Sequence, residues 1–341
     1  MKRCEAWALL LAVAMVGCGA ESESIADPAP SGPEGGTTTP GAPASSGGAP
    51  GTSSSGGTAG EASALDAFWA TFQAGDIDGV KAAQAKLVAA RAAAPNDPKL
   101  PIVLGMSYVW ANAENARAKT PMALPEMQAA AQATIASLQD GTKLAPDEPR
   151  AWVHLGTAMV TIGATTGDTA MRDQGQAMVV QKTMPMEKAE ASFALAAAMS
   201  QAPLGTPGFD QSIEYFFTAF EDCLDNKLDR DRPDFSSYDA KRTSSRPKDV
   251  CFNQPHWPHA EEGNFLVFGD ALVKANKLDA AKKAYAAALA VPEAATWKYR
   301  DVVSGRLAED LTKRMRSYRV PGATAASVGA APFVCVQCHQ R

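Results

Sequence analysis

Two cysteines and a histidine near the C-terminal end of the sequence have a spacing that could do chemistry. Cys335, Cys338 and His339 form the pattern Cys-x-x-Cys-His. In this pattern each thiol can add across a vinyl group of haem, and the histidine becomes the proximal ligand of the iron. The pattern therefore predicts one covalently bound haem c. The alternative is a thiol or disulfide pair beside an incidental histidine.

The iron of such a haem has a sixth coordination position, for which two other histidines are candidates. His256 and His259 flank a Trp-Pro pair, and either imidazole could bind the iron opposite His339. A methionine is an equal candidate, since the chain has 12 of them. With Cys223 and Cys251, the same two histidines could instead form a zinc site of two thiolates and two imidazoles.

The N-terminal segment has the pattern of an export signal. A basic start at residues 1–3 precedes an apolar run at residues 6–16, which is too short for a permanent membrane span. The following Met-Val-Gly-Cys resembles the lipobox of bacterial lipoproteins, in which the cysteine is acylated and becomes the new N-terminus. We therefore expect residues 1–17 to be a lipoprotein signal peptide and Cys18 to carry the membrane anchor. Ordinary signal cleavage near Gly19 and Ala20 is the alternative.

Residues 18–62 are almost entirely Gly, Ser, Thr, Pro and Ala. Such a composition cannot bury enough apolar surface to offset chain entropy, so we expect a disordered tether. A tether behind a lipid anchor would hold the folded part away from the membrane. The expected location is the bacterial cell envelope, on a membrane surface facing the periplasm or the cell exterior.

The remaining cysteines can be assigned by compartment. Cys4 belongs to the expected signal peptide and Cys18 to the lipid anchor. In an oxidising compartment Cys223 and Cys251 are expected to form a disulfide, which closes a polar and charged loop insertion at residues 224–261. Closing a loop of this size stabilises the fold by roughly 3 kcal/mol. The C-terminal pair is then left for haem or for each other.

Composition bounds the fold class and the kind of partner. The net charge of -5 and the pI near 5.5 give no basic surface for nucleic acid. Aromatic residues are only 7% of the chain, and alanine dominates its apolar fraction. This composition suits closely packed helices better than strands of β-branched residues, so we expect an all-α protein.

A repeated pattern of small and large apolar residues indicates pairs of packed helices. Its clearest copy comprises Phe265, Phe268, Gly269, Leu272, Ala281, Tyr285, Ala288 and Pro292. The small Gly269 and Ala281 would let two antiparallel helices approach closely, while Phe268, Leu272 and Tyr285 would fill the space beside them.

Two half-copies of the pattern lie further towards the N-terminus. Residues 152–159 repeat the first half and residues 189–196 repeat the second. We expect residues 163–184 between them to be an insertion, and His154 to be a packing or groove residue. After the clear copy, residues 294–318 are expected to form one long terminal helix.

This pattern resembles the tetratricopeptide repeat over roughly residues 63–318. The resemblance implies a solenoid of antiparallel helix pairs whose concave groove binds another protein. A generic bundle of alanine-rich helices is the alternative. Residues 319–341 would then be a flexible tail that carries the Cys-x-x-Cys-His motif.

Together these observations predict a membrane-tethered, exported scaffold that binds a protein partner, for which a redox protein is one candidate. The haem motif adds electron transfer. We expect no enzymatic activity and assign no catalytic residue, because the sequence has no nucleophile elbow, phosphate loop or metalloprotease helix. The alternative is a non-haem adaptor lipoprotein whose Cys-x-x-Cys-His is a thiol or disulfide tail.

Overall fold

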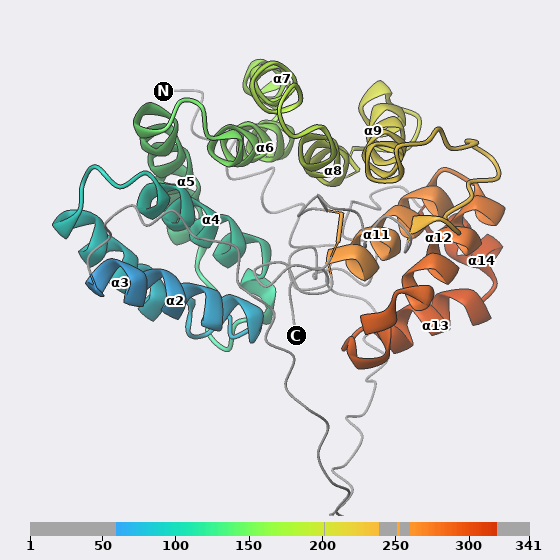
Figure 1. Ribbon diagram of the computed structural model, residues 1–341, viewed down its shortest axis with the longest axis horizontal. Helices are drawn as coiled ribbons and strands as arrows, with labels where there is room; N and C mark the ends of the chain where they lie inside the picture. Colours follow the sequence, from blue (N-terminus) through green and yellow to red (C-terminus); the bar gives the residue numbers. More distant parts are fainter. Residues whose placement is uncertain (1–58, 201, 239–250, 253–259, 319–341) are drawn as a thin grey trace, which may run out of the picture.

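A computed structural model describes residues 59–200, 202–238, 251–252 and 260–318. In these ranges every regular element is helical, and the helices form a curved row (Figure 1). The helices are α2 (Ala59–Gln73), α3 (Val80–Ala93), α4 (Lys99–Ala113), α5 (Leu124–Leu144), α6 (Pro149–Thr166), α7 (Thr169–Met178), α8 (Lys188–Met199), α9 (Pro207–Leu224), α11 (Ala260–Lys274), α12 (Leu278–Ala290), α13 (Arg300–Ala308) and α14 (Leu311–Ser317). The all-α prediction is confirmed.

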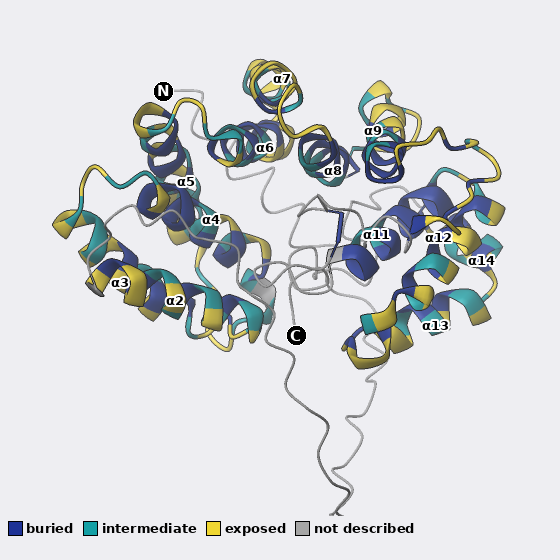
Figure 2. Cartoon of the chain, in the orientation of Figure 1, coloured by how far each residue is buried: buried dark blue, intermediate teal, exposed yellow. Residues whose placement is uncertain are grey.

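Consecutive helices pack in pairs. The most extensive contacts join α4 to α5, α6 to α7, α8 to α9 and α11 to α12. In Figure 1, α4, α6, α8 and α11 lie along the inner side of the curve, and α5, α7 and α9 lie outside them. The buried residues follow the faces where these helices meet (Figure 2). Each pair thus completes its core against its neighbours, as in helical-repeat proteins.

Glycines allow the closest approaches between paired helices. A Cβ atom on Gly269 of α11 would overlap the ring of Tyr285 on α12. A Cβ atom on Gly175 of α7 would overlap the carbonyl oxygen of Gly156 on α6. Only a residue without a side chain permits these contacts. The sequence pattern predicted a close approach of these two helices at Gly269, although it expected Tyr285 to fill the space beside the pair.

The prediction of an insertion at residues 163–184 is wrong. Helix α6 continues to Thr166, and α7 with a π-helical turn at Val179–Thr183 packs along it as its partner helix. The apolar pattern missed this helix because α7 is mostly polar. Its buried contact with α6 is made by a glycine, Gly175, which carries no apolar signal.

The C-terminal prediction of one long helix at residues 294–318 is also wrong. The chain forms a 3-10 turn at Pro292–Thr296 and then the two short helices α13 and α14. The break between them is fixed by Asp310, whose carboxylate accepts a hydrogen bond of 2.9 Å from the backbone N–H of Thr312 at the start of α14. At the other end, α2 begins at Ala59, inside the segment predicted to be tether.

Among the described helices, none has the length and apolar character that a membrane crossing requires.

Candidate functional site

The predicted site residues fall into two groups. Those that lie outside the described residues are Cys18, His256, His259, Cys335, Cys338 and His339. Those that the structure describes are Cys223 and Cys251. The lipid anchor, the haem links and the candidate axial histidines are therefore not placed, and they remain predictions.

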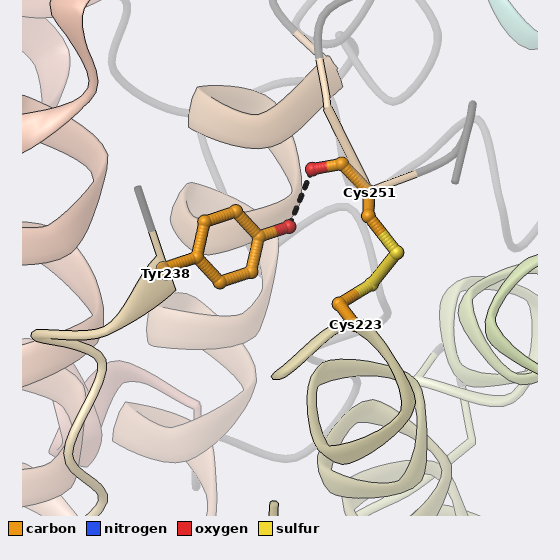
Figure 3. The surroundings of a disulfide bond; sticks show 3 residues. All are labelled: Cys223, Tyr238 and Cys251. Carbon is orange, nitrogen blue, oxygen red and sulfur yellow. Dashed lines mark hydrogen bonds between the residues drawn. A yellow bond between two sulfur atoms is a disulfide. The ribbon is translucent and has the colours of Figure 1, made fainter. Parts of the chain in front are cut away.

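Cys223 and Cys251 are joined by a disulfide (Figure 3). Cys223 lies near the C-terminal end of α9, and the two Cα atoms are 5.6 Å apart. Both residues are buried, and the phenol of Tyr238 donates a hydrogen bond of 2.5 Å to the carbonyl oxygen of Cys251. A zinc site would need the two sulfur atoms as thiolates, so the disulfide argues against that alternative.

The loop insertion enclosed by the disulfide contributes to the core. Phe235 and Tyr238 are buried, and their rings lie 5.1 Å from the ring of Phe265 on α11. Phe220 of α9 stacks on Phe265 at 4.6 Å. The composition of residues 224–261 predicted a polar and charged loop insertion, so the buried aromatic residues within it were not expected. The available signal in the sequence was the presence of two aromatic residues, Phe235 and Tyr238, in a mostly polar segment.

A buried carboxylate anchors the start of this loop insertion. Glu221 on α9 accepts hydrogen bonds from Lys227 Nζ at 2.6 Å, from Arg230 at 2.5 Å and from the backbone N–H of Leu228 at 3.1 Å. Burial by itself would raise the pKa of Glu221, but these donors outweigh it and lower the pKa to about 2. The guanidinium of Arg230 also lies 4.3 Å from the centre of the Phe217 ring.

A second buried polar cluster joins the C-terminal helices. Asp270 on α11 has no exposed surface, and its Oδ1 accepts hydrogen bonds from Tyr285 Oη at 2.6 Å and from Arg306 Nε at 3.0 Å. These donors come from α12 and α13. Burial raises the pKa of Asp270 above its ordinary value, although Arg306 and Tyr285 favour the charged form. No sequence pattern predicted this cluster.

The inner side of the row includes one face of α6. Helix α7 packs on the outer side of α6, so the exposed stripe of α6, which contains Arg150 and Thr161, faces inward. His154 lies on the same stripe, and its Nε2 is buried without a hydrogen-bond partner among the described residues. Burial and the neighbouring Arg150 lower the pKa of His154 to about 4, so its imidazole is neutral at pH 7.

Among the described residues, no three His, Cys, Asp or Glu side chains come together as a group that could hold a metal ion. Comparisons of the chain with protein-family models, with curated proteins and with solved structures each find no match.

Proposed function

We propose that this protein is an exported lipoprotein scaffold, similar in architecture to tetratricopeptide repeats, that binds a protein partner along the inner side of its curved row. The observation that supports this most strongly is the stacking of helix pairs with α4, α6, α8 and α11 on the inner side. Stacked pairs of this kind present an extended concave surface, which repeat proteins use for binding. The glycine contacts at Gly269 and Gly156 fit the same architecture.

The scaffold carries one haem c in this proposal, attached through Cys335 and Cys338 with His339 as the proximal ligand. A bound haem supplies one-electron transfer. The distribution of cysteines supports the assignment, because the disulfide occupies Cys223 and Cys251 and leaves the C-terminal pair available. The sixth ligand would be His256 or His259. Cys18 would anchor the protein to the membrane, so the partner is an envelope protein, and a redox protein is the natural candidate.

The haem assignment predicts a covalent product. After coexpression with a haem-ligation system, the denatured wild-type chain should stain for haem peroxidase activity, because thioether bonds survive denaturation. The Cys335→Ala, Cys338→Ala double variant should not stain. The Cys223→Ala, Cys251→Ala variant is the matched control and should stain as the wild type does. An unstained wild-type band of the correct mass would leave the adaptor with a thiol tail as the function.

The partner assignment predicts where cross-links form. A photoreactive amino acid at Thr161, exposed on the inner stripe of α6, should cross-link to another envelope protein in intact cells. The same amino acid at Gln174, exposed on the outer helix α7, is the control and should give no such product. Equal cross-linking at both positions, or none at Thr161, would contradict binding along the inner side.

A further inference from the structure

A half-open cavity of about 600 Å³ is lined by residues of α3, α4, α5 and the segments beside them. These helices lie towards the N-terminal end of the row in Figure 1. The size of the cavity falls within the range of about 300–1,000 Å³ that is typical of small-molecule sites. Much of its lining consists of alanines, including Ala111, Ala129 and Ala133, with Met122 and Tyr108 adding larger apolar surface. The small side chains leave the space that larger residues would fill.

Side-chain hydrogen bonds fix the segment between α4 and α5, which forms one wall of this cavity. Asn115 donates through Nδ2 to the carbonyl oxygen of Met122 at 3.1 Å and accepts through Oδ1 from the Met122 N–H at 2.6 Å. The carboxylate of Asp78 accepts from the backbone N–H of Lys119 at 2.8 Å. These bonds fix the segment between α4 and α5, so the cavity is formed before a ligand enters.

The charges at the cavity compensate one another. Lys81 lies 3.9 Å from Glu126, and Lys119 lies 3.4 Å from Asp78. All four residues line the cavity, and two positive charges meet two negative charges. A ligand with a net charge would therefore be repelled by a like charge as readily as it is attracted by an opposite one. This arrangement favours a neutral molecule.

One polar group in the lining lacks a hydrogen-bond partner in the part of the chain that the structure describes. The amide Nε2 of Gln84 on α3 is buried and has no hydrogen bond among the described residues. A buried donor without an acceptor is unfavourable. Because Gln84 lines the cavity, a rotation of its side chain that brings Nε2 to the cavity would let a bound ligand supply the missing acceptor.

We propose that this cavity binds a neutral, mainly apolar small molecule with a carbonyl oxygen that accepts a hydrogen bond from Gln84. The lining alanines contact the apolar body of the ligand, and the Gln84 amide sets its orientation. The lining residues belong to α3, α4, α5 and the segments beside them and include none of α6, so the test of this site is independent of the cross-linking test at Thr161.

The test uses Nile red, a neutral apolar dye with a carbonyl group, in a fluorescence titration of the full chain. The wild type should give a saturable signal for one dye per chain. Ala129→Trp, at an exposed lining position of α5, should fill the cavity and weaken binding at least about tenfold. Gln84→Leu should weaken binding by about fivefold, the effect of one lost hydrogen bond.

The matched control is Ala136→Trp, the same substitution at an exposed position of α5 that does not line the cavity. It should leave dye binding unchanged, and circular dichroism should show equal helix content in both tryptophan variants. Equal weakening by the two variants, or no saturable binding by the wild type, would overturn the site. The anionic dye anilinonaphthalene sulfonate is then tested as a competitor of Nile red. If it binds more tightly than Nile red, and Ala129→Trp abolishes its binding, the site does not prefer a neutral ligand.

Discussion

Arg306→Met is expected to lower the free energy of unfolding by about 3–5 kcal/mol at pH 7, because it leaves the carboxylate of Asp270 buried without its cation. Asp270 is completely buried, and Arg306 is its cationic hydrogen-bond donor at 3.0 Å. Tyr285 would remain as a neutral donor and cannot replace the charge. Chemical denaturation of the variant and the wild type at pH 7 measures the difference.

The penalty should depend on pH in a defined direction. Burial raises the pKa of Asp270 in the folded state above the ordinary value of 3.8, so the folded protein binds a proton that the unfolded chain has released. The contribution of Asp270 to stability therefore falls as the pH rises from the ordinary pKa to the raised one. Loss of Arg306 raises the folded pKa further and extends this window upward. The penalty of Arg306→Met should be smaller at pH 5 than at pH 7.

Two further variants separate the buried charge from the loss of side-chain packing. Adding Asp270→Asn to Arg306→Met removes the unpaired charge and should recover part of the stability and most of the pH dependence. Arg300→Met changes an exposed arginine of the same helix, α13, and should cost less than about 0.5 kcal/mol. If both arginine variants behave alike, the buried ion pair does not stabilise the C-terminal helices.

Removal of the disulfide by Cys223→Ala, Cys251→Ala should cost about 3–4 kcal/mol. The two cysteines are 28 residues apart in sequence, and a cross-link over such a loop restricts the unfolded chain by about this amount. The loss also releases the segment that holds Phe235 and Tyr238 against α11. Thermal unfolding of the variant and of the wild type under non-reducing conditions tests the expectation.

Reduction of the wild type provides an independent check, since it should shift the unfolding midpoint as far as the double substitution does. Tyr238→Phe is the milder comparison. It removes the hydrogen bond to the Cys251 carbonyl oxygen and should cost about 1 kcal/mol. A midpoint that is unchanged by reduction would show that the disulfide does not stabilise the described fold.

The sequence predicted two features of the fold, one from a local apolar pattern and one from the chemistry of cysteine in an oxidising compartment. The close approach of α11 and α12 at Gly269 follows from a helix-pair pattern, and the disulfide follows from the expected compartment. Helix α7 was missed because its close contact is made by Gly175, which has no side chain to mark a period. A contact through the backbone leaves no apolar pattern in the sequence.

Features that join distant residues were not predictable in this way. The ion pair of Asp270 with Arg306 links positions 36 residues apart, and nothing in either local sequence marks them as partners. The cavity beside Gln84 is lined by residues of three helices, so it becomes visible only when the helices are placed together. Periodicity shows which face of a helix is buried and does not show which side chains meet there.

The pairwise stacking of the helices allows the row to bend elastically along its length. Because each pair rests mainly on its neighbours, a small rotation at every interface adds up to a large change in the distance between the two ends. The disulfide and the stacked rings of Phe220 and Phe265 stiffen the part from α9 to α11. Bending would therefore concentrate at the interfaces between helix pairs on the N-terminal side of α9, and the row could close around partners of different width without unfolding a helix.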